Sequence, residues 1–189
     1  FSAAVKATTI SIDANSVNFN GNTTADITVS SATEITLAAG KNIIGYVDVS
    51  VADLDVTLNM SGGDSTITGA IGKTHAVTTI NAASAGATST FDASVNAGKI
   101  VLGAGDAIFN GNVTGAVSTI SGNVTIAAGK DVEGAIINSG TTNIGSLTLE
   151  GTSTISDAVG GDNAFAKVTT ATGSTATFEG LVTTTTLDF

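Results

Sequence analysis

The chain has 189 residues, of which 42% are hydrophobic and only 12% are charged; it contains no cysteine and no proline, and its net charge is −10. This acidic balance disfavours nucleic acid, which needs basic side chains facing its phosphates, and the lack of cysteine excludes disulfides and thiolate nucleophiles. No uncharged apolar run approaches the ~18 residues of a membrane-spanning helix, so we expect no nucleic acid partner and no direct membrane insertion in this segment.

Apolar doublets at positions i and i+2 open the chain and predict β-strands. Each doublet alternates with Ser, Thr, Asn or Asp, the pattern of a strand with one buried face. Three steps between doublets take the chain from Ile10 to Ile35, which are 25 residues apart. That spacing predicts one coil of a three-sided parallel β-helix. The first four doublets are Ile10/Ile12, Val17/Phe19, Ile27/Val29 and Ile35/Leu37.

The next stretch predicts a corner. The apolar residues expected to face inward have odd numbers before Ala52-Asp53 and even numbers after it. A strand cannot make that change without a bend. We therefore expect Asp53 and Asp55 to point outward on one face of the second strand. The two apolar runs are Val47/Val49/Val51 and Leu54/Val56/Leu58. The same alternation predicts that Val56, Ile126 and Leu149 are buried.

A long block occurs twice. Residues 19–22 and 35–41 return as 109–112 and 124–130, and residues 65–72 return as 153–160, with offsets of 90, 89 and 88 residues. Self-similarity at a fixed period is the mark of a repeat architecture. Phe1, Phe91 and Phe178 begin matching segments, so we predict internal repeats at approximately 1–90 and 91–177, with 178–189 starting a third copy. The whole chain, 1–189, then reads as a single β-solenoid fragment of a longer array.

These patterns predict an all-β protein, a right-handed parallel β-helix of roughly eight coils. The alternative is an antiparallel β-sandwich, which also has short strands at regular spacing. A sandwich does not need an internal repeat of about 88 residues, so the β-helix is favoured.

Few residues have the chemistry of an active site. Glycoside hydrolysis needs two converging carboxylates, and Asp53 and Asp55 are the best pair. The second copy has Thr141-Thr142-Asn143-Ile144 at that place, which favours a solvated outer face. His75 is the only histidine, and its counterpart is Asn163, which favours a polar turn residue.

Two further motifs are weaker. A Gly-Gly-Asp sequence occurs at 62–64 and at 160–162 and echoes calcium-binding β-rolls, but such sites need a nine-residue repeat. The threonine run 183–186 suggests an ice-binding ladder, yet Thr88/Thr90 and Thr152/Thr154 do not fall at equivalent positions. We therefore predict no catalytic, cofactor-binding or metal-binding residue.

Residues 109–117 (Phe-Asn-Gly-Asn-Val-Thr-Gly-Ala-Val) and 65–72 (Ser-Thr-Ile-Thr-Gly-Ala-Ile-Gly) resemble the passenger repeats of rickettsial surface autotransporters, in particular the outer membrane protein B and A group of surface cell antigens. The resemblance involves both copies. It implies a secreted passenger on the bacterial cell surface or outer membrane that contacts host cells. It supplies no catalytic residue.

The expected function is accordingly that of a structural rod or surface layer that mediates adhesion to host cells, with repeats giving many equivalent contacts. The expected partners are a host cell-surface protein and neighbouring passenger repeats. Two alternatives are a polysaccharide-degrading β-helix enzyme and a self-assembling surface-lattice subunit without a receptor.

Overall fold

The structure is a computed structural model that describes residues 1–60 and 62–189. Within these ranges all regular structure is β, in 22 strands. Their bounds are β1 Val5–Ile12, β2 Ser16–Phe19, β3 Thr23–Val29, β4 Thr33–Leu37, β5 Ile43–Ile44, β6 Val47–Val49, β7 Val56–Met60, β8 Ser65–Ile67, β9 Val77–Ala82, β10 Thr88–Phe91, β11 Val95–Leu102, β12 Asp106–Phe109, β13 Val113–Thr119, β14 Val124–Ile126, β15 Val132–Glu133, β16 Ile136–Asn138, β17 Ile144–Leu149, β18 Ser153–Ile155, β19 Val159–Gly160, β20 Phe165–Thr170, β21 Ala176–Phe178 and β22 Thr184–Asp188. In the described ranges there is no helix that could cross a membrane.

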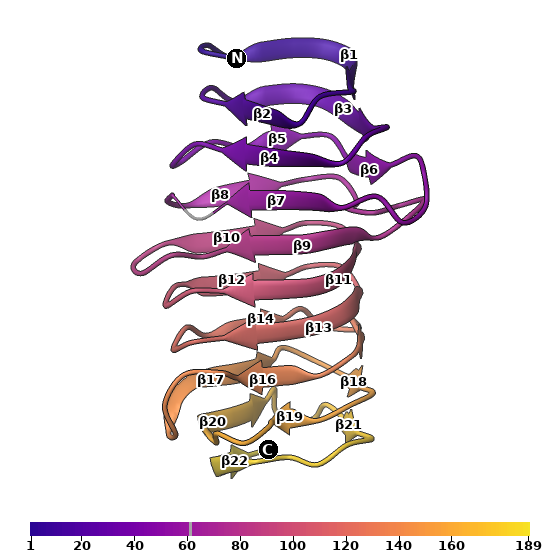
Figure 1. Cartoon of the computed structure of the whole chain (residues 1–189). Coiled ribbons are helices and arrows are strands. Elements are labelled where there is room, and N and C mark those ends of the chain that lie inside the picture. The colour runs from indigo at the N-terminus through magenta and orange to yellow at the C-terminus, as the bar shows by residue number, and fades with distance from the viewer. Residues whose placement is uncertain (61) are drawn as a thin grey trace.

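The strands stack as the turns of a solenoid (Figure 1). Strands of neighbouring turns pair in parallel, so that two long sheets run along the rod. Among the described residues, antiparallel pairing is limited to the isolated bridges Val49–His75 and Asn138–Asn163. The predicted β-solenoid is therefore confirmed, and the antiparallel sandwich is wrong.

Three ladders of paired residues define three sides of the rod. The first side is Val5, Thr23, Ile43, Ile67, Phe91, Phe109, Ile126, Leu149 and Thr170. The second side is Ile10, Ile27, Val47, Ile71, Val95, Val113, Val132, Ile155 and Phe178. The third side is Val17, Ile35, Leu58, Ile80, Ile100, Val117, Ile136, Val159 and Val182.

The turns are shorter and more numerous than the doublet spacing predicts. Ile10 pairs with Ile27 and not with Ile35, which lies on Val17. The expected coil of 25 residues is therefore wrong, because the third doublet already begins the next turn. The chain makes about nine turns rather than eight. The paired strands stay in register while the connections between them change in length.

The interior is a continuous stack of aliphatic and aromatic side chains. Val56, Ile126 and Leu149 are fully buried, as predicted. Two aromatic pairs stack along the axis: Phe91 on Phe109, both buried, at 4.9 Å, and Phe1, which is 54% exposed, on buried Phe19 at 5.2 Å between ring centroids. Full burial of one such side chain stabilises the fold by about 1.5–3 kcal/mol, so the stacked core is the main source of cohesion between turns.

Two glycines allow the turns to approach each other at equivalent places in the two copies. A Cβ atom on Gly21 would lie 2.3 Å from the backbone of Ala3, and one on Gly111 would lie 2.2 Å from the backbone of Ala93. These distances are shorter than any real contact, so only glycine fits there. The two Asn-Gly-Asn motifs are thus explained by packing between neighbouring turns.

Candidate functional site

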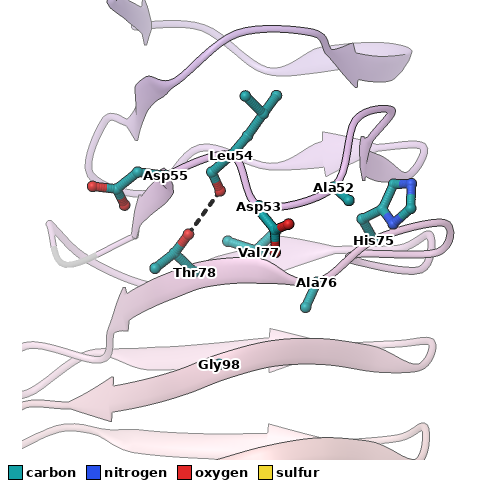
Figure 2. A pocket seen from close by; sticks show the side chains of 9 residues that line it. All are labelled: Ala52, Asp53, Leu54, Asp55, His75, Ala76, Val77, Thr78 and Gly98. Carbon is teal, nitrogen blue, oxygen red and sulfur yellow. Dashed lines mark hydrogen bonds between the residues drawn. The ribbon is translucent and has the colours of Figure 1, made fainter.

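A groove of about 450 Å³ lies on the outside of the rod beside β9 (Figure 2). Its wall is the connection between β6 and β7, its end is the segment before β9, and its floor continues onto β11. The residues that line it are Ala52, Asp53, Leu54, Asp55, His75, Ala76, Val77, Thr78 and Gly98.

Hydrogen bonds hold the wall of the groove in place. The Thr78 hydroxyl donates to the Leu54 carbonyl at 2.9 Å and accepts the Val56 N–H at 3.1 Å. The groove end is held by Asp48, whose carboxylate accepts the Thr74 N–H at 2.7 Å and the Thr74 hydroxyl at 2.6 Å. The two bonds to Asp48 are charge-assisted and therefore stronger than neutral ones, whereas the wall is held by two neutral bonds to Thr78.

The acids of the groove do not converge. Figure 2 shows the Asp53 carboxylate directed toward β9, while the Asp55 carboxylate points away on the far side of Leu54. The His75 ring lies at the opposite end of the groove from Asp55. Paired acid–base chemistry needs two groups that each reach their own atom of one bound substrate, and this arrangement does not bring these three residues together.

The structure confirms the predicted corner at Ala52-Asp53 and the exposure of both acids. The expectation that the acids share one face of a strand is wrong, because both precede β7. Val51 is likewise 48% exposed rather than inward, since β6 ends at Val49. Asp53 has a φ of 58°, a left-handed conformation that Asp tolerates better than most residues. The connection is therefore a tight loop and not a bent strand.

The second copy fills the equivalent place with its own side chains. The connection before β17 corresponds to the connection before β7, with Thr142 at the place of Asp53 and the left-handed residue, Asn143 with a φ of 66°, one position later. Thr185 at the start of the third copy corresponds to Gly98 of the second copy. The Thr185 hydroxyl donates a hydrogen bond to the Asn143 side-chain oxygen, and the Thr142 hydroxyl donates to Asn163 at 3.3 Å. Hydrogen bonds between side chains therefore cross this place, whereas the equivalent place beside β9 is an open groove.

The two weaker motifs have structural roles. The Asp64 carboxylate accepts the Thr88 N–H of the next turn at 2.8 Å, and Asp162 lies in the connection after β19. Thr184 and Thr185 donate their hydroxyls to groups of the chain itself. Thr90 lies between Thr66 and Ile108 on its face, so a continuous threonine row is absent there. In the described ranges no three His, Cys, Asp or Glu residues are grouped closely enough to hold a metal ion.

A row of side chains at one corner is a feature that none of the sequence motifs above indicated. The Asn22 side-chain oxygen accepts the Asn42 N–H at 3.0 Å, and the Asn42 oxygen accepts the Thr66 N–H at 2.8 Å. In the second copy Asn112 accepts the Asp131 N–H at 3.2 Å, and Asp131 accepts the Thr154 N–H at 2.7 Å. We call each row an Asx relay. Its signal in the sequence is an Asn or Asp before successive strands of one side.

Comparison with known proteins gives one informative similarity. The chain is 32% identical over 180 residues to outer membrane protein A of Rickettsia rickettsii, and the match covers 95% of this chain. The chain spans only 7% of the length of that relative. No protein-family model and no solved structure matches the chain. Over nearly its whole length, the chain is thus similar to a short segment of a rickettsial outer membrane protein.

Proposed function

We propose that this chain is a rod-shaped segment of a bacterial cell-surface protein of the rickettsial outer membrane protein group, and that it mediates adhesion to host cells. The observation that carries the proposal is the match to outer membrane protein A along 95% of a chain that forms a continuous stack of parallel turns. A stack of turns extends in one direction and exposes long polar sides, which suits a passenger that projects from an outer membrane.

The charge of the rod suggests the chemistry of its partner. The net charge is −10, and an ion pair between Lys167 and Asp188, with 2.8 Å between nitrogen and oxygen, neutralises one exposed acid. Other exposed acids face solvent on several turns, among them Asp53, Asp55, Glu150 and Glu179. The proposed partner is therefore a host cell-surface protein with a basic patch, and binding should weaken as salt rises because exposed charges are screened within about 8 Å at physiological ionic strength.

The test measures binding of the purified chain to host cells at low and high salt. One variant replaces Asp53, Asp55, Glu150 and Glu179 by their amides, and a matched variant of opposite sign carries Lys6→Gln and Lys99→Gln. We expect the first variant to lose most of the salt-sensitive binding and the second to bind at least as well as the parent. Equal binding by both variants at all salt concentrations contradicts the proposed partner.

The alternatives have their own readouts in the same experiment. Cleavage of a polysaccharide that Asp53→Asn abolishes would establish the enzyme. Ordered sheets of the pure chain by electron microscopy, without cell binding, would establish the lattice subunit. The non-convergent acids of the groove favour adhesion over the enzyme, because a hydrolase needs paired carboxylates across its substrate.

A further inference from the structure

The two copies of the repeat occupy different sides of the rod. Val5 lies on the first side, and its counterpart Val95 lies on the second side, where it stacks through Ile71 on Val47. Four steps of the first-side ladder lead from Val5 to Phe91, and Val95 follows on the next side. One copy therefore spans four turns and one further side.

The other two sides follow the same rule. Ile10 lies on the second side, while its counterpart Ile100 stacks on Ile80 on the third side. Phe19 pairs with Leu37 on the third side, while its counterpart Phe109 pairs with Phe91 on the first. From the first copy to the second, residues of the first side move to the second side, those of the second to the third, and those of the third to the first. This is the result of a rotation about the axis of the rod.

The order of the strands shows the exchange independently. One sheet contains β1, β3, β5, β8 and β10 in sequence, and their counterparts β11, β13, β15, β18 and β21 lie in the other sheet. The strand β1 matches β11 at both ends with an offset of 90 residues, as β3 matches β13. The irregularity within β1, between Lys6 and Thr9, recurs within β11 between Asn96 and Lys99.

The hydrogen bonds at the corners also lie on different sides of the rod in the two copies. The Asx relay of the first copy precedes strands of the first side, and the relay of the second copy precedes strands of the second side. The bond from Gly45 N–H to the Thr68 hydroxyl likewise recurs from Gly134 N–H to Ser156, both at 3.1 Å. The whole pattern of corner contacts has thus turned by one side.

We infer that successive copies of this repeat present their equivalent surfaces on successive sides of the rod, so that a partner recognising a repeated side surface approaches neighbouring copies from different directions. This inference about partners rests on the proposed surface function. A flat layer of receptors then binds one copy of the repeat, and the next copy remains free to bind a separate partner molecule. Neighbouring copies therefore suit partners that bind from different directions around the rod, and they do not increase the avidity of binding to one flat surface.

The test uses two pairs of cysteine substitutions in a chain that has no cysteine of its own. Thr36→Cys with Thr125→Cys joins equivalent outward positions of the two copies, on the third and first sides. Thr36→Cys with Ser118→Cys is the matched control, because Asn59, Asn81 and Val101 connect these positions along the third side. Four turns separate the control pair, about 19 Å at 4.8 Å per strand.

Each variant is labelled with desthiobiotin on a short linker, and its dissociation from a flat, dense streptavidin layer is compared with that of the singly labelled chains. We expect the Thr36/Ser118 chain to dissociate at least about tenfold more slowly than the single labels, because its second contact is intramolecular. The Thr36/Thr125 chain should dissociate at the single-label rate within about twofold, because its labels do not face one plane.

An equal slowing for both double variants overturns the inference. Spin labels at the same positions give a second readout, since the Thr36/Thr125 distance must exceed the Thr36/Ser118 distance because a displacement across the rod is added to the separation along its axis. Neither measurement involves a host cell or a receptor. Failure here is therefore distinct from failure of the proposed adhesive function, which the cell-binding experiment tests.

Discussion

The first and second copies of the repeat share their corners but differ at the groove. Both carry an Asx relay, a stacked phenylalanine pair and a glycine that a neighbouring backbone touches. At the groove, the connection that contains Asp53 is replaced in the second copy by one that contains Asn143, and Gly98 is replaced by Thr185, whose hydroxyl bonds to the Asn143 side chain. The shared features all satisfy or pack backbone between turns, whereas the groove touches solvent. The comparison shows that the contacts between turns define the repeat and that the outer surface is where the copies diverge.

The largest effect should come from a charge in the shared core. Ile126 is fully buried on the first side between Phe109 and Leu149. Ile126→Asp should lower the free energy of unfolding by about 4 kcal/mol or more, because an unpaired carboxylate would be buried in an apolar stack. Urea unfolding followed by circular dichroism measures it. The controls are Ile126→Val, which should cost about 1 kcal/mol, and Asp53→Asn, which should cost less than about 0.5 kcal/mol. Similar losses of stability for Ile126→Asp and Asp53→Asn would contradict the assignment of core and surface.

The next effect tests whether close packing is the reason for the glycine at position 111. Gly111→Ala should cost about 3 kcal/mol, since its Cβ would overlap the backbone of the turn before it and overpacking displaces that backbone. Gly129→Ala is the matched control, because nothing lies within 4 Å of its Cβ position and only its left-handed φ of 72° opposes the change, at about 1 kcal/mol. Thermal melting of the two variants separates close packing from backbone conformation, and equal shifts would show that packing is not the reason for the glycine.

A smaller effect tests the Asx relay. Asp131→Ala removes the acceptor of the Thr154 N–H and should cost about 1 kcal/mol. Asp131→Asn should be nearly neutral, because Asn42 fills the same role in the first copy. Hydrogen exchange at the Thr154 N–H is the direct readout. Faster exchange in the Asp131→Ala variant alone supports a stabilising role of the Asx relay, and unchanged exchange in both variants contradicts it.

The smallest effect should be a gain in stability. The Thr23 hydroxyl is buried without a hydrogen-bond partner, and the second copy has Val113, also buried, at this position. Thr23→Val should raise the free energy of unfolding by about 1 kcal/mol, because a buried unsatisfied polar group is removed at nearly constant volume. The reverse change, Val113→Thr, should destabilise by a similar amount in the same urea titration. A loss from both substitutions would show that the two sites are not equivalent.

The alternation of residue types predicted the strands and most of their buried residues, because period 2 follows directly from strand geometry, and the internal repeat favoured a solenoid over a sandwich. Val51 is an exception, because β6 ends before it. The length of a turn could not be predicted from the alternation. Ile27 and Ile35 carry the same pattern, and only the fold decides that Ile27, not Ile35, stacks on Ile10. The groove was missed for a related reason: Thr78 and Leu54 are 24 residues apart, and no local pattern links them.

The differences in spacing between the copies fall in the connections and not in the ladders. The first copy has one more residue than the second between Val29 and Ile35, between Met60 and Ser65, and between Ala82 and Phe91. The strands on both sides of each difference keep their pairing. A single-residue insertion or deletion in such a protein therefore changes one loop and leaves the neighbouring turns undisturbed. A gene encoding this fold can gain and lose residues in its surface loops over evolutionary time, while the rod that carries the loops stays intact.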